Sequence, residues 1–341
     1  MKMASLLPSV IFPLLCLLIS NLEISVAQSV GVCYGRNGDN LPSEADVVAL
    51  YKSRGITRMR IYDPNRATLE ALRGSNIELI VDIFKSDLQS LNDAGKATEW
   101  VQNNIRAFPD VKFRYIAVGN EVHPNDAEAQ FVLPAMRNIQ NALSSANLQS
   151  QIKVSTAIDT TLQEGYPPGN GVFSAAANSY ITPIIRFLAE NGSPLLANIY
   201  PYFAYVNNQA QIQLPYALFT SPGVVVHDEV TNLDYRNLFD ALLDTLYSAL
   251  EKASAPDLKI VVSESGWPSE GGDGASVENA GTYYRNLITH VKGGSPKRKE
   301  GPIETYLFAM FDENKKGGNP VEQHFGLFSP NQQPKYQLNF S

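Results

Sequence analysis

Strand-like and helix-like runs alternate along almost the whole chain, and this alternation is the strongest constraint on its fold. Eight apolar, β-branched or aromatic runs are typical of strands buried on both faces. They are Val30–Tyr34, Thr57–Tyr62, Ile77–Ile83, Phe113–Gly119, Ile152–Ala157, Leu195–Tyr200, Leu258–Ser263 and Thr305–Phe311. Eight β–α units in one chain of this length predict a single-domain α/β fold, the (β/α)8 TIM barrel, in preference to an open sheet.

Helical signals fall between the strand-like runs. They are a capping box at Ser43–Asp46 with a stop at Gly55, leucines at positions 238, 242, 246 and 250, and the segments Asp126–Leu143 and Glu278–Val291. The leucine stripe indicates core packing and carries no functional message. The segment Tyr202–Leu233 is long, aromatic and punctuated by glycine and proline. We expect it to form an elaborated loop or small subdomain over the sixth strand.

Residues 1–27 have the pattern of a secretory signal peptide. Lys2 gives a positive start, residues 6–19 form an apolar core, and Ser25-Val26-Ala27 supplies the small residues that signal peptidase needs. An uncleaved membrane anchor is the alternative. The apolar run is short and contains two prolines, which favours cleavage after Ala27. We therefore predict a secreted, soluble protein whose catalytic domain spans residues 28–341.

Charge and motif content exclude several function classes. The formal net charge is −7, and the run Lys297-Arg298-Lys299 lies among glycines and a proline, as in a solvated loop. No nucleic-acid or membrane partner is therefore expected. The four histidines, at positions 123, 227, 290 and 324, lack metal-ligand spacing. There is no phosphate-binding loop and no G-x-S-x-G elbow, so we expect no metal and no cofactor.

The two cysteines cannot form a disulfide in the predicted mature chain. Cys16 lies in the signal peptide, which leaves Cys33 alone on a predicted strand. Cys33 is expected to be a buried small apolar residue and not a nucleophile. Stability must then come from a large core, which a chain of this size can form.

Two of the predicted strands end in a glutamate. Glu121 follows the fourth and Glu264 the seventh, and the C-terminal ends of barrel strands line the active mouth. Either glutamate could instead cap a turn or pair with a buried cation. Two carboxylates facing each other across a cleft fit glycosidic hydrolysis, in which one protonates the leaving oxygen and the other stabilises or attacks the anomeric carbon. Repulsion between them raises the pKa of the acid.

Aromatic and charged residues gather at the same strand ends. The aromatic set is Tyr34, Tyr62, Tyr200, Tyr202, Phe203, Trp267 and Phe311. Sugar rings stack on such surfaces, so this set predicts a saccharide groove, with about half of its members expected to be packing beneath loops instead. Glu313, Lys316 and Glu322 follow the eighth strand. Glu322 is a rival for the acid, but its place on a loop favours a supporting or substrate-binding role.

Six segments resemble the plant β-1,3-glucanases of glycoside hydrolase family 17. They are Gly31–Gly35, Met59–Pro64, Val118–Val122, Asn198–Phe203, Val261–Ser269 and Phe308–Asn314, and together they cover essentially the whole mature chain. The resemblance implies a TIM barrel, endo-hydrolysis of β-1,3-glucan with retention, and a role in defence against fungi. It implies that Glu121 is the acid/base and Glu264 the nucleophile. The supporting residues that it implies are Asn120, Glu313, Lys316 and Glu322.

Some points stay open within this resemblance. Asp312 departs from the asparagine of many members, which affects the local charge. Members sorted to the vacuole carry a C-terminal extension, whereas this chain ends at Ser341, so we expect it in the apoplast or cell wall. We also expect a monomer. A mixed β-1,3;1,4-glucanase and a glucan-binding protein without turnover are the competing hypotheses. Presence of both opposed glutamates argues against the latter. Asn191-Gly192-Ser193 is a glycosylation sequon.

Overall fold

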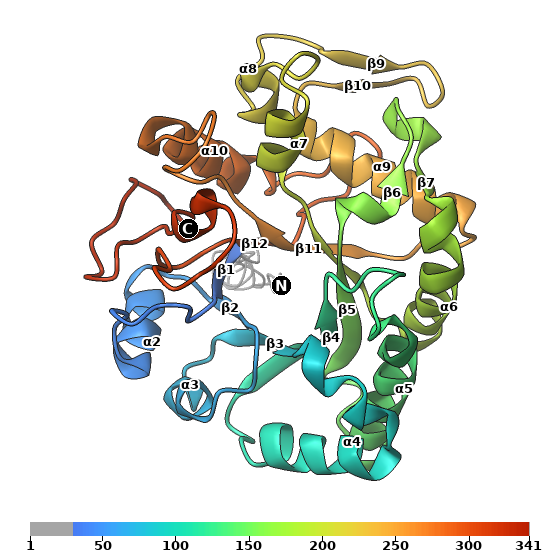
Figure 1. Cartoon of the computed structure of the whole chain (residues 1–341), viewed down its shortest axis with the longest axis vertical. Coiled ribbons are helices and arrows are strands. Elements are labelled where there is room, and N and C mark those ends of the chain that lie inside the picture. The colour runs from blue at the N-terminus through green and yellow to red at the C-terminus, as the bar shows by residue number, and fades with distance from the viewer. Residues whose placement is uncertain (1–29, 341) are drawn as a thin grey trace, which may run out of the picture.

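Eight parallel strands close into a barrel at the centre of the molecule (Figure 1). The computed structural model describes residues 30–340, so the predicted signal peptide lies outside the described residues. The strands are β1 (Val30–Tyr34), β2 (Arg58–Ile61), β3 (Glu78–Ile83), β4 (Lys112–Asn120), β5 (Lys153–Asp159), β8 (Leu195–Asn198), β11 (Ile260–Ser265) and β12 (Thr305–Leu307). Their order around the barrel is β1-β12-β11-β8-β5-β4-β3-β2. The predicted (β/α)8 TIM barrel is confirmed.

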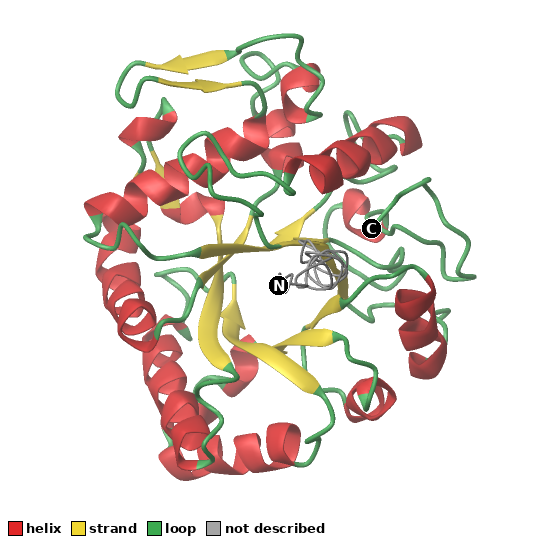
Figure 2. Ribbon diagram, turned by 180° about the vertical axis from the view of Figure 1, so that it is seen from behind, coloured by secondary structure: helices red, strands yellow, loops and turns green. Residues whose placement is uncertain are grey.

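Helices surround the barrel as an outer ring, which is seen from behind in Figure 2. The ring contains α2 (Glu44–Ser53), α3 (Arg66–Leu72), α4 (Ala94–Val101), α5 (Ala129–Ser145), α6 (Ala175–Asn191), α9 (Leu238–Lys252) and α10 (Val277–His290). The eighth unit differs from the prediction. Within the described chain β12 is followed only by the 3-10 turn η6 (Pro320–Gln323), because the segment after it is rich in glycine, proline and asparagine, which are poor helix formers.

The predicted and observed starts of the helices agree at α2 and differ at α5. The Ser43 hydroxyl accepts the Asp46 backbone N–H at 3.3 Å and caps α2, as its sequence predicts. Helix α5 begins at Ala129, later than the predicted Asp126. There the Asp126 carboxylate accepts the His123 backbone N–H at 2.9 Å and closes a turn instead.

Two insertions lie side by side on one flank of the barrel (Figure 1). The predicted one, after β8, forms α7 (Pro201–Asn207), α8 (Leu214–Ala217) and the hairpin β9 (Val226–Asp228)–β10 (Leu233–Tyr235). The other, after β5, was not predicted and forms the short hairpin β6 (Gln163–Glu164)–β7 (Val172–Phe173). Buried Asp228 joins the two insertions by accepting the backbone N–H of Gly169 at 2.7 Å.

The barrel interior is tightly packed. Cys33 on β1 is fully buried, and its thiol lies 3.4 Å from the Ser263 carbonyl oxygen. Burial raises the pKa of this thiol far above its ordinary value. Cys33 is therefore an inert core residue, as its sequence context predicts. Within residues 30–340 there is no helix with the length and apolarity that a membrane crossing requires.

Candidate active site

A cavity of about 700 Å³ opens at the C-terminal ends of the strands. Glu121 and Glu264 both line it. Its wall also includes Tyr62, Asp82, Asn120, Asn198, Tyr200, Glu313, Lys316 and Glu322. The cavity therefore brings together residues from strands that lie far apart in the sequence, as the barrel predicts.

Irregularities in the sheet aim both glutamates into the cavity. The register of β4 against β5 shifts between Ala117 and Asn120, and that of β11 against β8 shifts between Val262 and Glu264. Such bulges redirect side chains. Glu121 itself has a φ of 51°, a left-handed conformation that is costly for a residue with a Cβ. The fold thus maintains strain at the position of one carboxylate.

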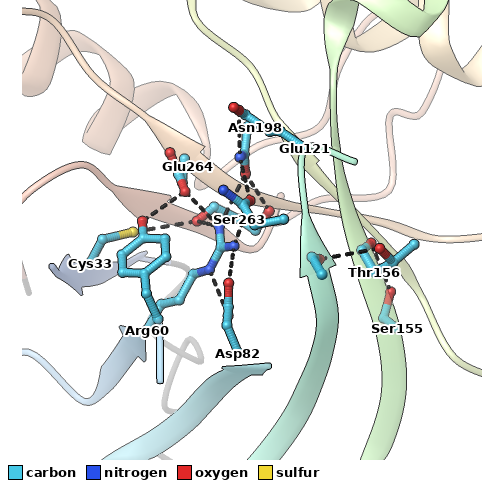
Figure 3. A network of polar contacts seen from close by, with 12 residues as sticks. Cys33, Arg60, Asp82, Glu121, Ser155, Thr156, Asn198, Ser263 and Glu264 are labelled. Atoms are coloured by element: carbon cyan, nitrogen blue, oxygen red, sulfur yellow. Dashed lines mark hydrogen bonds and ion pairs between the residues drawn. The ribbon is translucent and has the colours of Figure 1, made fainter. Parts of the chain in front are cut away.

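Glu264 is enclosed by hydrogen-bond donors (Figure 3). Its Oε1 accepts from Arg60 Nη1 at 2.9 Å and from the Tyr62 hydroxyl at 2.7 Å, and its Oε2 accepts from the Tyr200 hydroxyl at 2.6 Å. Burial raises the pKa values of both tyrosines well above the ordinary value, so both hydroxyls remain protonated and can donate. These three donors hold Glu264 in one orientation as a hydrogen-bond acceptor.

Arg60 is the centre of this network, and its role was missed in the sequence. It is fully buried, and besides Glu264 its guanidinium bonds Asp82 at 2.6 Å, Asn120 Oδ1 at 2.9 Å and Asn198 Oδ1 at 3.1 Å. Burial opposes the charge, but Asp82 and Glu264 raise the pKa of Arg60 well above its ordinary value. The possibility that Glu264 pairs with a buried cation is therefore realised, within a site that also contains a second carboxylate.

Glu121 has a different environment from Glu264. Burial, and next the negative charge of Glu264, raise the pKa of Glu121 to about 7. Its Oε1 accepts one hydrogen bond, from Asn198 Nδ2 at 2.9 Å, which opposes part of this shift. The same Nδ2 also donates to Asn120 Oδ1 at 2.9 Å. Glu121 and Glu264 thus differ in their partners, and the raised pKa of Glu121 favours its protonated form up to about pH 7.

The charged residues after β12 line the cavity wall across the barrel from Glu121. Glu313 is 4% exposed, and within the described chain its Oε2 has no hydrogen-bond partner. Burial raises the pKa of Glu313, although Lys316 lowers it. Lys316 Nζ lies 2.9 Å from Glu322 and 4.1 Å from the centre of the Phe308 ring. The cation in contact with Glu264 is Arg60, at 2.9 Å, whereas Lys316 pairs with Glu322.

The predicted aromatic set divides into two groups. Tyr62, Tyr200 and Phe203 line the cavity. Tyr34, Tyr202, Trp267 and Phe311 are buried, with at most 2% exposed, and are not part of its wall. Trp267 packs against Tyr202 with ring centres 5.1 Å apart and donates its indole N–H to the Gly274 carbonyl at 2.9 Å. For these four the substrate-binding prediction is wrong, because their rings are packed in the interior and do not reach the cavity wall.

Cavity-lining aromatic residues were also missed in the sequence. They are Phe84, Phe308 and Phe325. Phe84 follows a strand end and could have been found by the rule that located Glu121. Phe325 lies in the loop after η6, where no sequence pattern predicts an orientation.

The departure at Asp312 is compensated locally. Both carboxylate oxygens of Asp312 lie 2.7 Å from Lys335 Nζ, and Oδ1 also accepts the Gly326 backbone N–H at 2.8 Å. The extra negative charge is therefore paired outside the cavity wall. In residues 30–340 no group of three or more His, Cys, Asp or Glu side chains is arranged to hold a metal ion.

Comparison with known proteins connects this site to a family. The family described as Glycosyl hydrolases family 17 matches residues 30–340. A glucan endo-1,3-beta-glucosidase of Vitis vinifera is 63% identical over 98% of each chain. An acidic glucan endo-1,3-beta-glucosidase isoform of Nicotiana tabacum is 56% identical over 95% of each chain. The structure of a beta-1,3-glucanase and allergen of Cryptomeria japonica pollen superposes with a TM-score of 0.88, at 47% identity, and covers 92% of this chain and 99% of that one.

Proposed function

Because the chain belongs to glycosyl hydrolase family 17, we propose that it cleaves internal β-1,3 linkages of glucans by a retaining double displacement. The observation that carries the proposal is the pair Glu121 and Glu264, which share one cavity but have different partners. One carboxyl group retains a proton near neutral pH, and the other is surrounded by donors. This asymmetry is what a glycosidase acid and nucleophile require.

In the first step Glu264 is the nucleophile and Glu121 the acid. A carboxylate oxygen of Glu264 attacks the anomeric carbon, the C1–O bond breaks, and Glu121 gives its proton to the leaving oxygen. Tyr200 and Tyr62 hold Glu264 in position for this attack. Since the oxygen of Asn120 is occupied by Arg60 and Asn198, its amide N–H groups are the part that can donate to substrate.

In the second step Glu121 acts as a base. Having lost its proton, it removes one from a water molecule, and the water oxygen attacks the anomeric carbon. The bond between this carbon and Glu264 breaks, and the product has the original anomeric configuration. The scheme predicts that the two carboxyl groups lie roughly 5–5.5 Å apart in the working enzyme. A separation of about 8 Å, with a water molecule between them, would indicate inversion instead.

Product analysis tests the substrate part of the proposal. Laminarin, a β-1,3-glucan, should be cut to oligosaccharides of several lengths, and a mixed β-1,3;1,4-glucan tested beside it should be cut more slowly. Faster release of oligosaccharides from the mixed-linkage glucan would favour the competing hypothesis. Binding of both polymers without products would mean that the protein is a glucan-binding protein.

Chemical rescue tests the two roles separately. With Glu121→Ala and a substrate that carries an activated leaving group, the covalent intermediate forms, and azide should attack it to give the β-glucosyl azide. With Glu264→Ala, azide takes the nucleophile's place and should give the α-azide. Glu322→Ala is the matched control and should turn over without azide. A β-azide from Glu322→Ala, with none from Glu121→Ala, would transfer the acid role to Glu322.

We also propose a biological setting. The pattern of residues 1–27 supports secretion to the apoplast or cell wall, where fungal β-1,3-glucan is an accessible substrate and defence the corresponding role. The protein acts there as a monomer. Detection of the intact chain in apoplastic washing fluid, with Gln28 as its first residue, would support this location, and recovery from vacuoles would contradict it.

A further inference from the structure

Phe84 is an apolar ring exposed in a mostly polar part of the cavity wall. It is 49% exposed, whereas most large apolar residues of residues 30–340 are buried. Other exposed large apolar side chains exist in the described chain, among them Tyr166 at 74%, but of these only Phe84 lines the cavity. Its neighbours in the wall include Asp82 and Lys85.

The strand geometry explains why this ring faces the mouth. Asp82 on β3 points into the barrel, where it bonds Arg60. Phe84 is two residues further and its backbone is still extended, with φ −57° and ψ 146°. Alternate residues of an extended chain share one face, so Phe84 lies above Asp82 and over the mouth.

The backbone of Phe84 is held on the side of Glu121. The Phe84 carbonyl accepts the Asp87 N–H at 3.0 Å and so starts the 3-10 turn η1 (Lys85–Asp87). The next residue, Lys85, lies 3.4 Å from the Glu121 carbonyl oxygen and 2.7 Å from Asp126. Strands β3 and β4 are also paired up to Ile83 and Val118. Phe84 therefore follows the strand next to the one that ends at the proposed acid, and the segments after these two strands are bonded to each other.

The location of the acid identifies which part of a glucan would meet this ring. Glu121 gives its proton to the leaving oxygen, so the leaving glucosyl units lie beside Glu121. Asn37, after β1, and Glu313, after β12, line the cavity beyond Glu264, at the other end. Asp159, Thr160 and Thr161 line it next to β4 and offer groups that can bond sugar hydroxyls. An exposed ring with polar groups close by fits a pyranose, which has an apolar face and a polar rim.

We propose that Phe84 is a stacking platform for a glucosyl unit on the leaving-group side of the scissile bond. The proposal rests on the proposed function and adds a binding site to it. Stacking there acts alike on bound substrate and transition state, so its loss raises KM more than it lowers kcat. The stacking affects only substrates that have a sugar on the leaving-group side of the scissile bond.

Two substrates separate this site from the rest of the cavity. A long laminari-oligosaccharide occupies both sides of the cleavage point, whereas β-laminaribiosyl fluoride has only fluoride on the leaving side. Phe84→Ala should lower kcat/KM on the oligosaccharide by about tenfold and leave that on the fluoride unchanged. Phe84→Leu keeps a large apolar side chain without a ring and should behave like Phe84→Ala. Phe84→Tyr and Tyr166→Ala are the matched controls and should behave like the wild type.

The outcomes distinguish this inference from the proposed function. Equal losses on both substrates would mean that Phe84 supports the catalytic groups by packing, and no loss on either would mean that it binds nothing. Each result overturns the stacking platform. A wild-type protein that cleaves the fluoride but no laminari-oligosaccharide would contradict the proposed function instead.

Discussion

Arg60 organises the site although it never reaches solvent. A fully buried guanidinium loses its hydration, which costs several kcal/mol unless partners replace the water. Here Asp82, Glu264 and the oxygens of Asn120 and Asn198 supply those partners. The same bonds that stabilise the cation therefore position Glu264, the proposed nucleophile, and the two asparagines.

Replacing Arg60 should separate stability from catalysis. In Arg60→Met two buried carboxylates lose their cation, so the free energy of unfolding should fall by about 3–5 kcal/mol. Adding Asp82→Asn should recover part of that stability without recovering activity, because Glu264 still lacks the cationic one of its three donors. Urea unfolding and laminarin hydrolysis measure the two effects. An Arg60→Met variant as stable as the wild type would contradict this account.

The proton on Glu121 depends on the charge of Glu264. Burial is the largest cause that raises the pKa of Glu121 to about 7, and the charge of Glu264 is the second largest. In Glu264→Gln the pKa of Glu121 should therefore fall, which NMR titration of labelled glutamate carboxyl carbons would detect. Glu322→Gln is the control and should leave it unchanged. In the active enzyme kcat/KM should decline as pH rises through about 7, since Glu121, the proposed acid, then loses its proton.

At the scale of elements, the loops decide which aromatic residues can meet substrate. Trp267 lies two residues after the end of β11 yet is 0% exposed, because Tyr202, Tyr205 and Tyr283 pack around it. Phe203 lies next to Tyr202 on α7 but lines the cavity. Neighbouring residues on one short helix thus take opposite roles.

Two substitutions test this division. Trp267→Ala should lower the free energy of unfolding by about 3–5 kcal/mol, because it leaves a large void in the core. KM for laminarin should stay unchanged in the folded protein. Phe203→Ala should raise KM for laminarin and leave the melting temperature close to that of the wild type. A raised KM for Trp267→Ala at unchanged stability would return that residue to the substrate groove.

The sequence predicted the strands and both opposed glutamates because both signals are local. An apolar run marks each strand, and its end locates the residue at the mouth. Arg60 could not be found in this way. Its partners lie 22, 138 and 204 positions away and come together only when the barrel closes. The burial of Trp267 likewise depends on contacts between loops, which have no periodic pattern.

For the whole molecule, the two ends of the barrel differ in how their charged groups are paired. At the N-terminal ends of the strands Arg114 pairs with Glu304 at 2.7 Å, and Arg58 pairs with Glu78 at 2.9 Å. At the C-terminal ends Glu121 lacks a cationic partner of this kind in the described chain and depends on a proton. The charge pairs that stabilise the fold and the proposed catalytic groups thus lie at opposite ends of the same strands.

The buried carboxyl groups predict that the protein is more stable in weak acid than at neutral pH. Burial raises the pKa of Glu121 to about 7, and it raises that of Asp244, which is fully buried on α9, to about 7. Between about pH 4 and 7 the folded protein therefore holds protons that the unfolded chain has released. Stability falls as pH rises through this window.

Thermal melts at several pH values would measure this effect. The midpoint at pH 5 should exceed that at pH 7.5, and the difference should shrink in Asp244→Asn, whose amide cannot lose a proton. Ser295 and the Lys297 backbone N–H, which bond Asp244 at 2.5 and 2.8 Å, oppose the shift. Below about pH 4 the trend should reverse, because groups with lowered pKa values, such as Glu251 beside Lys297 and Arg298, then become protonated. A higher midpoint at pH 7.5 than at pH 5 would show that Glu121 and Asp244 are ionised in the folded protein despite their burial.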